Sequence, residues 1–188
     1  MKFLTTPDYA RFATPLGPML AAATDHGLCG LWFDGQRHQP DMVAWKLAPE
    51  HPLLQQTALF MDAYFAGDAG HFSLPLDLAG GTPFQQSVWW ALLQIPRGET
   101  TSYGALSQSL GRPSAVRAVA GAVGRNPVSV LVPCHRVVGR DGSLTGYAGG
   151  LERKTALLQL ETGRTYASPP VCAKGDTRGA AKVLGAWV

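Results

Sequence analysis

The chain has 188 residues, of which 46% are hydrophobic and 15% charged, with a net charge of +3; it can bury a core, and wholesale disorder is excluded. No run approaches the roughly 20 apolar residues of a membrane helix, and Pro7 and the polar residues before it interrupt any signal-peptide core. We therefore expect a soluble, cytoplasmic protein.

The first half of the chain predicts three strands followed by a helix. The strands are short apolar-rich runs separated by turn signals, over residues 9–14, 19–23 and 27–33. After a loop over 36–49, apolar residues at helical spacing predict a helix over 52–65, and a short strand over 72–76 follows. We expect this small α/β domain to occupy residues 1–81, ending at Gly80-Gly81.

From Thr82 the signals become helical. Thr82-Pro83-Phe84-Gln85 combines a threonine N-cap, a proline at the first helical position and a glutamine at the third, which is a capping box. We expect that helix to end at Pro96-Arg97-Gly98 and a final helix to cover 151–160. Residues 82–164 form the predicted second domain, and residues 165–188 a flexible tail. Because the first domain combines strands with a helix and the second is helical, the predicted fold class is α+β.

Two short helices in this second domain have the proportions of a helix-turn-helix. Ser102 caps the first, which runs through Leu110, and Pro113 opens the second. The buried side of the second is predicted to hold Val116, Val119, Ala120 and Val123, and its outer side Ser114, Arg117, Gly121 and Arg125. Many structural helix pairs share this pattern, so DNA binding and a purely structural role both stay open here.

The charges are divided unevenly along the chain. Residues 1–81 carry 4 Lys and Arg against 8 Asp and Glu, whereas residues 82–164 carry 9 against 4. A basic block on an otherwise acidic protein is expected where a polyanion docks. A solvated basic face without a partner fits the charges equally well.

Cys134 is the cysteine that has a possible general base beside it in the sequence. The three cysteines (Cys29, Cys134 and Cys172) are too few and too scattered for a disulfide framework or a zinc module. A free thiol is only a few per cent thiolate at neutral pH, so a nucleophilic cysteine needs a base within reach. His135 is adjacent, and a bridging water would solve the geometry between neighbouring side chains.

Glu161 is a candidate partner for His135. It is predicted at the C-terminal end of a helix, where the helix dipole disfavours a carboxylate, and an imidazole N–H would compensate. Together these residues suggest a Glu–His–water–Cys relay. The alternative is a buried cysteine, a surface histidine and a solvated glutamate.

Several motifs fall in one pattern. Residues 133–138 read Pro-Cys-His-Arg-Val-Val, and around them stand Ser102-Tyr103, Arg117-Ala118-Val119, Asn126-Pro127-Val128, Tyr147-Ala148-Gly149-Gly150-Leu151 and Glu161. With these motifs, residues 84–163 closely resemble the O6-alkylguanine-DNA alkyltransferase family, and the first half resembles it more loosely. The resemblance implies a ribonuclease H-like N-terminal domain and a winged-helix or helix-turn-helix C-terminal domain.

The resemblance also implies roles for the catalytic residues. Cys134 would be the alkyl acceptor, His135 would take its proton through a water, and Glu161 would orient His135. Asn126 would brace the active-site turn, and Tyr103 would help to rotate the nucleotide out of the duplex and protonate the leaving guanine.

The remaining site residues are implied to contact DNA. Arg117 would fill the gap left in the base stack, and Val137, Tyr147 and Ala148 would line the base pocket. The expected partner is double-stranded DNA carrying O6-alkylguanine, with O4-alkylthymine as a further lesion. No cofactor, no membrane and no obligate protein partner are expected, so the protein would be a monomer, nucleoid-associated in a bacterium.

Two departures from the family pattern carry expectations. Many relatives have serine where this chain has Ala148, which predicts a tuned substrate range rather than lost activity. Some relatives bind zinc in the N-terminal half, but this chain has only Cys29 there, with His26, His38 and His51 at irregular spacing, so no metal site is predicted.

Rival functions remain to be separated. A non-catalytic sensor of alkylated DNA would lack the acceptor cysteine, which is present here. A cysteine hydrolase would use Cys134, His135 and Glu161 but would leave Arg117 and the basic helix pair unexplained. Transcriptional control by an alkylated form would need a cysteine-rich N-terminal module, which this chain lacks.

Overall fold

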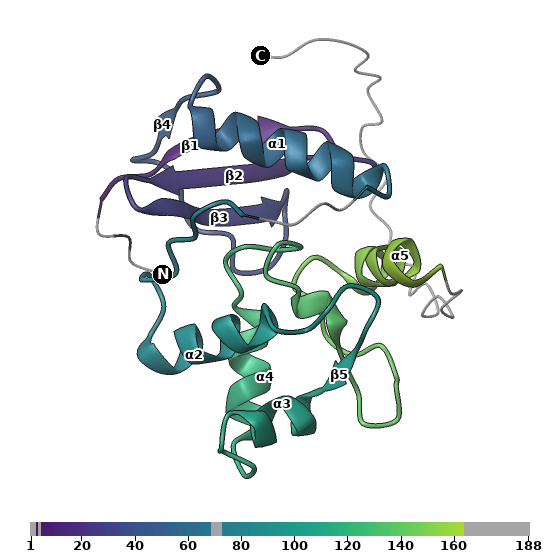
Figure 1. The fold of residues 1–188 in the computed structure, drawn as a ribbon. Helices are drawn as coiled ribbons and strands as arrows, with labels where there is room; N and C mark the ends of the chain where they lie inside the picture. Colours follow the sequence, from purple (N-terminus) through teal and green to yellow (C-terminus); the bar gives the residue numbers. More distant parts are fainter. Residues whose placement is uncertain (1–2, 4, 69–72, 164–188) are drawn as a thin grey trace, which may run out of the picture.

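The computed structural model describes residues 3, 5–68 and 73–163. A sheet covered by one helix forms the N-terminal half, and a set of short helices and loops forms the C-terminal half (Figure 1). This architecture confirms the predicted α+β class. No helix within these ranges is long and apolar enough to span a membrane.

The sheet has the order β3-β2-β1-β4. Strands β1 (Asp8–Phe12), β2 (Met19–Thr24) and β3 (Gly27–Phe33) form an antiparallel meander, and β4 (Lys46–Leu47) joins β1 in parallel. The first strand ends two residues earlier than predicted, because the chain turns at Thr14, whose carbonyl accepts from the N–H of Gly17. The segment predicted as a loop contains β4.

Helix α1 (Pro52–Phe65) has the predicted bounds and lies across one face of the sheet (Figure 1). Side chains alternate across a strand, so Met19, Ala21 and Ala23 of β2 join the main core, while Leu20 and Ala22 pack with Trp32 in a smaller cluster. The predicted strand over 72–76 is wrong for its described part. There Leu76 makes a single bridge to Leu28 at the edge of β3.

Helix α2 (Pro83–Leu92) begins with the predicted capping box at Thr82. It ends before Ile95, earlier than predicted, because the next residues form i to i+3 turns: the N–H of Ile95 donates to the carbonyl of Leu92. Trp89 is buried and donates its indole N–H to the carbonyl of Ala122 at 2.9 Å, which ties α2 to the helix pair.

The helix pair consists of α3 (Tyr103–Ser109), capped by Ser102 as predicted, and α4 (Val116–Gly124). Helix α4 begins three residues after Pro113, so the prediction that Pro113 opens it is wrong. A turn closed by the N–H of Ala115 and the carbonyl of Arg112 occupies these residues instead. Val116 is consequently 36% exposed rather than buried.

Three further elements complete the C-terminal half. The turn η1 (Cys134–Arg136) leads into β6 (Val137–Val138), which pairs in parallel with β5 (Thr101–Ser102). Helix α5 (Leu151–Thr162) is two residues longer than predicted at its C-terminal end and contains Glu161. The β5–β6 pair places the start of α3, and therefore Tyr103, beside the Cys134 segment.

The edge of β3 also joins the two halves. The N–H of Leu31 donates to the carbonyl of Pro127 at 2.8 Å, and the N–H of Ser129 donates to the carbonyl of Leu31 at 2.7 Å. The hydroxyl of Ser129 lies 3.1 Å from the side-chain oxygen of Gln36. The segment before Cys134 is therefore held against the sheet by backbone hydrogen bonds.

Candidate active site

Asn126 closes the loop that carries Cys134. Its side-chain amide donates to the carbonyl of Val132 at 2.7 Å and lies 3.0 Å from the sulfur of Cys134. Its oxygen accepts from the N–H of Val128 at 3.0 Å. Within this loop Val130 adopts a φ of 72°, which is uncommon for a β-branched residue. Asn126 thus stabilises a sharply bent backbone and contacts the sulfur itself.

The thiol of Cys134 is almost enclosed, with the residue 6% exposed. Burial raises its pKa, while the Asn126 amide, the positive charge of Lys154 and the backbone N–H groups of Cys134 and His135 act in the opposite direction. The thiolate therefore has stabilising groups around it, but it forms readily only if a base removes the proton.

His135 is the neighbouring base, and it is fully buried. Its Nε2 lies 3.0 Å from Oε1 of Glu161. Burial lowers the pKa of His135, and the Glu161 carboxylate opposes that shift. A neutral His135 whose Nε2–H donates to Glu161 keeps Nδ1 free of a proton, so Nδ1 can act as the acceptor.

Glu161 is a buried carboxylate held by several donors. Arg136 forms a two-pronged ion pair with it, Nε to Oε2 and Nη2 to Oε1, both at 2.8 Å. The hydroxyl of Tyr64 donates to Oε1 at 2.7 Å. Although burial would raise the pKa of Glu161, the hydrogen bonds from His135 and Arg136 hold it well below its usual range. Glu161 therefore stays ionised beside His135.

Lys154 is a second buried charge near the thiol. Its ammonium donates to the carbonyls of Val137 and Thr145, each at 2.6 Å. Burial lowers its pKa to about 8, and the Cys134 charge opposes that shift. Lys154 thus joins the strand after Cys134 to the loop that precedes Tyr147.

A cavity of about 300 Å³ adjoins this loop. Its lining includes three of the predicted site residues, Tyr103, Tyr147 and Ala148. Burial raises the pKa of Tyr103, so its phenol stays protonated at neutral pH, and its oxygen lies 3.5 Å from the carbonyl of Gly146. Cys134 and Val137 are not among the residues that line the cavity, yet the charge of Cys134 also raises the pKa of Tyr103 and of Tyr147.

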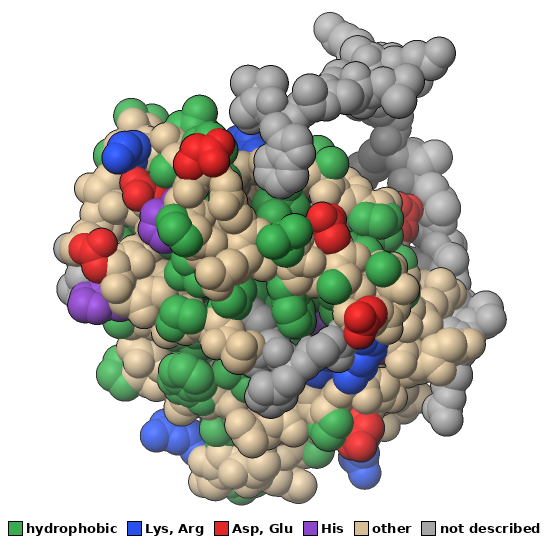
Figure 2. Space-filling model, turned by 45° about the horizontal axis from the view of Figure 1, so that its top comes forward, with side chains coloured by type: hydrophobic (Ala, Val, Ile, Leu, Met, Phe, Trp, Pro, Cys, Tyr) green, Lys and Arg blue, Asp and Glu red, His purple; other side chains and the backbone are tan. Residues whose placement is uncertain are grey.

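Arg117 stands apart from this cluster. It is exposed on α4, whose residues Val119, Ala122 and Val123 are buried. Ser114, in the turn before α4, and Arg125, at its C-cap, are exposed as well. In the view of Figure 2, where the α1 side of the molecule comes forward, the described Lys and Arg side chains are spread apart rather than gathered in one patch. Within α4, Arg117 is the one arginine, and it does not line the cavity beside Tyr103.

The structure thus brings together Cys134, His135, Glu161 and Asn126, with Tyr103, Tyr147 and Ala148 around a nearby cavity. Tyr64, Arg136 and Lys154 were not predicted as site residues. Arg136 directly follows His135, which was a usable signal. Lys154 occupies the apolar side of α5 with Leu157 and Leu158, where a lysine is unusual enough to be noticed.

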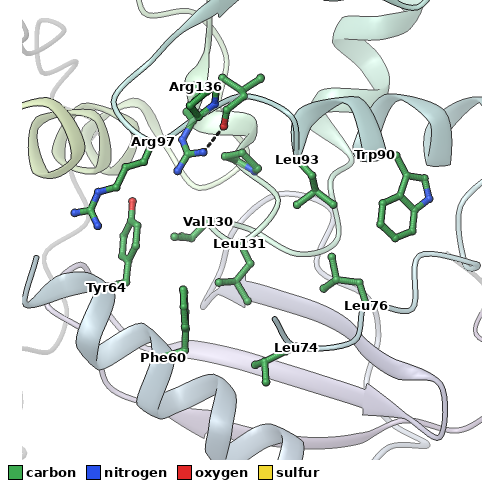
Figure 3. A pocket seen from close by; sticks show the side chains of 13 residues that line it. Phe60, Tyr64, Leu74, Leu76, Trp90, Leu93, Arg97, Val130, Leu131 and Arg136 are labelled. Carbon is green, nitrogen blue, oxygen red and sulfur yellow. Dashed lines mark hydrogen bonds between the residues drawn. The ribbon is translucent and has the colours of Figure 1, made fainter. Parts of the chain in front are cut away.

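A larger cavity, of about 660 Å³, lies beside Tyr64 and Arg136, two side chains that bind Glu161 (Figure 3). Most of its lining is apolar and comes from several segments: α1 (Phe60), the segment after α1 (Leu74, Leu76), α2 and the turns after it (Trp90, Leu93, Ile95, Pro96) and the loop before Cys134 (Val130, Leu131, Pro133). Tyr64, Arg97 and Arg136 line it as well, and Figure 3 shows them close together at one end. The site residues predicted from the sequence do not line this cavity.

Metal ligands are not grouped in the described ranges: no three His, Cys, Asp or Glu side chains there are placed to hold an ion. Cys29 is buried on β3, in the smaller cluster with Leu20 and Trp32, and this burial raises its pKa to about 12. Cys172 lies outside the described residues.

Both halves of the chain match domain models of one protein family. Residues 8–78 match the model of the 6-O-methylguanine DNA methyltransferase ribonuclease-like domain, and residues 83–163 match the model of the DNA binding domain of the same family. The sequence is 47% identical over 148 residues to the methylated-DNA–protein-cysteine methyltransferase of Mycobacterium leprae, covering 79% of this chain and 88% of that protein. For the Haemophilus influenzae protein of the same name, the identity is 41% over 159 residues, covering 84% and 88%.

Solved structures give the same result. The crystal structure of Mycobacterium tuberculosis OGT in complex with DNA matches with a TM-score of 0.77 and 43% identity, covering 86% of this chain and 96% of that one. The two-domain fold expected from the sequence, with a ribonuclease-like N-terminal half and a helical DNA-binding-type C-terminal half, is therefore confirmed.

Proposed function

Because the chain belongs to the 6-O-methylguanine DNA methyltransferase family, we propose that it repairs DNA directly, by moving the alkyl group of O6-alkylguanine onto its own Cys134. The observation that supports this most is the arrangement of the thiol: Asn126 contacts the sulfur, and the buried His135–Glu161 pair follows it in the chain. O4-alkylthymine, which carries the same alkoxy group, is a second substrate of this proposal.

The chemistry is a displacement at the alkyl carbon. The Cys134 proton passes to Nδ1 of His135 through a water, and the imidazolium formed is stabilised by the ionised Glu161. The sulfur then bonds to the alkyl carbon as the carbon–O6 bond breaks. The electron pair leaves with guanine, which takes a proton from Tyr103. Solvent returns that proton to Tyr103 and removes one from His135, so the protons balance.

One protein molecule repairs one lesion in this scheme. The product is a thioether, which has no carbonyl that water could attack, unlike the thioester of a cysteine hydrolase. The alkylated Cys134 therefore stays alkylated. Hydrolytic turnover would need an acyl-cysteine intermediate, which an O6-alkyl lesion cannot form.

DNA would dock on the helix pair. Arg117, exposed on α4, would enter the duplex and replace the stacking lost when the nucleotide rotates out. The extruded base then occupies the cavity lined by Tyr103, Tyr147 and Ala148. Recognition through the DNA backbone suits a protein that inspects any sequence. The protein would act as a monomer without a cofactor, in the cytoplasm and near the nucleoid of a bacterium.

A mass spectrum of the protein tests this function. After mixing with a duplex that contains O6-methylguanine, the protein should gain one methyl group, on the peptide with Cys134, and the lesion should disappear in equal amount. Cys134→Ser should gain nothing, whereas Cys29→Ser, a matched control at a buried thiol, should react normally. Binding without transfer would indicate a sensor, and repeated turnover by an unmodified protein a hydrolase.

A further inference from the structure

The hydroxyl of Tyr64 links the N-terminal half to the relay. Tyr64 lies near the C-terminal end of α1, is 4% exposed, and donates to Oε1 of Glu161 at 2.7 Å. Figure 3 shows its ring rising from α1 toward the side on which Arg97 and Arg136 lie. The guanidinium of Arg97 stands 5.4 Å from the ring centroid. A helix of the opposite half therefore touches the carboxylate that orients His135.

Several donors share one oxygen of Glu161. Within the described part of the chain, Oε1 receives Nε2 of His135 at 3.0 Å, Nη2 of Arg136 at 2.8 Å and the hydroxyl of Tyr64 at 2.7 Å. A carboxylate oxygen offers about two lone-pair sites, so three donors compete for it. The bond from Tyr64 is shorter than the bond from His135. It therefore weakens the hydrogen bond that Oε1 accepts from the imidazole.

The strength of the Glu161–His135 bond matters for proton transfer. A carboxylate favours the imidazolium form, so a stronger bond would raise the pKa of His135. A histidine that is already protonated cannot take the Cys134 proton. Two positive charges, on Arg136 and Lys154, also lie near His135. They lower the pKa of His135, in the opposite direction from Glu161.

We propose that Tyr64 is a positioning residue of the alkyl-acceptor site, which holds Oε1 of Glu161 and limits its pull on His135, so that the imidazole stays neutral and ready to accept the thiol proton. The proposal rests on the proposed function for its catalytic consequence. Its physical part, the influence of one phenol on His135 through Glu161, does not depend on DNA.

Tyr64→Phe tests the proposal because it removes the hydroxyl and keeps the ring against Arg97. We expect the pKa of His135, followed by NMR titration of its ring protons, to rise by about half to one pH unit. The acid limb of the rate of alkyl transfer should move to higher pH by the same amount. Tyr9→Phe, a matched control in the cluster on the other face of the sheet, should change neither. The His135 signals are assigned by their loss in His135→Asn.

A second variant reverses the direction. Fluorotyrosine at position 64 has a more acidic phenol and is a stronger donor, so it should lower the pKa of His135 without removing any atom of the contact. This variant also serves if Tyr64→Phe folds poorly.

Two results would overturn the proposal. One is a folded Tyr64→Phe protein in which the pKa of His135 is unchanged or lower. The other is a reduced melting temperature with an unchanged titration and pH profile, which would mean that the hydroxyl only supports packing. Failure of the wild-type protein to accept a methyl group would instead contradict the proposed function, and the titration would still decide the role of Tyr64.

Discussion

The side-chain amide of Asn126 lies 3.0 Å from the sulfur of Cys134 and also donates to the carbonyl of Val132. One side chain therefore sets both the bend of the loop and the place of the nucleophile. An N–H that points at sulfur favours the thiolate over the thiol, because the anion is the better acceptor. Loop geometry and thiol reactivity are thus coupled through Asn126.

Replacing Asn126 should damage both properties. Asn126→Ala removes the acceptor of the Val128 N–H and leaves the Val132 carbonyl with the N–H of Cys134 alone. We expect the free energy of unfolding in urea to fall by about 2–3 kcal/mol. The rate of alkyl transfer should fall at least about tenfold, because the thiolate loses its N–H donor. Ser129→Ala, in the same loop but away from the sulfur, is the control. A normal rate in Asn126→Ala would contradict the coupling.

Glu161→Gln should lower both the stability of the protein and its rate of alkyl transfer, and a second substitution should restore only the stability. The change leaves the Arg136 side chain, 12% exposed, without its counter-charge, which costs about 3–5 kcal/mol for a buried pair. The rate should fall about a hundredfold, since the imidazolium loses its carboxylate. Adding Arg136→Met should recover part of the stability but none of the rate. Recovery of the rate in the double variant would show that charge on Glu161 is dispensable.

Acid should destabilise the protein through His135 and Glu161. The pKa of His135 is depressed from 6.5 in the folded state, so the unfolded chain binds more protons there and stability falls as the pH drops below about 6.5. The pKa of Glu161 is depressed from 4.5, so stability present above about pH 4.5 is lost below it. Urea unfolding at a series of pH values should show both losses. His135→Gln should flatten the curve only in the upper window; parallel curves for the two proteins would refute this assignment.

Arg117 should affect DNA binding and leave the thiol alone. Because Arg117 is exposed on α4, Arg117→Ala should leave the melting temperature unchanged. Affinity for unmodified duplex should weaken, and the slope of log K against log salt should decrease by about one if Arg117 meets a phosphate. Arg140→Ala, in the loop after β6, is a charge-matched control. An equal loss in both variants would indicate general charge rather than a specific contact.

Methylated Cys134 should destabilise the fold. The residue is 6% exposed and its sulfur already touches the Asn126 amide, so an added methyl group has little free space. Overpacking of this kind costs about 1–3 kcal/mol. Thermal unfolding before and after reaction with a methylated duplex should show a lower melting temperature for the product. An unchanged or higher value would mean that the cavity near Tyr147 admits the methyl group.

The sequence predicted the elements whose signals are local. The capping box at Thr82 and the helical pattern over 52–65 placed α2 and α1, because caps and apolar spacing act within a few residues. A boundary prediction failed at Pro113, where two local structures compete: the i to i+3 turn between Arg112 and Ala115 forms there and delays the start of α4. Among the relay residues, His135 was predicted from its place beside Cys134, and Glu161 from its place at the C-terminal end of a helix and from the family resemblance.

Other parts of the site needed the three-dimensional structure. Tyr64 lies 97 positions from Glu161 in the sequence, and on α1 it shares the buried side with Leu54 and Met61, so its pattern is that of a core residue. Lys154 would ordinarily be expected in solvent, and only the carbonyls of Val137 and Thr145, brought together by the loop between them, explain its burial.

The hydrogen bonds between Leu31 and the Pro127–Ser129 segment bear on how this chain can be divided. Dividing the chain at Gly80-Gly81 would follow the sequence pattern. It would also remove the backbone hydrogen-bond partners that Leu31 of β3 provides to the Pro127–Ser129 segment. The segment before Cys134 thus pairs with the edge strand β3 through backbone hydrogen bonds. A shortened repair module made from the second half alone would therefore need a substitute edge, built in from another strand, before its cysteine could be held in place.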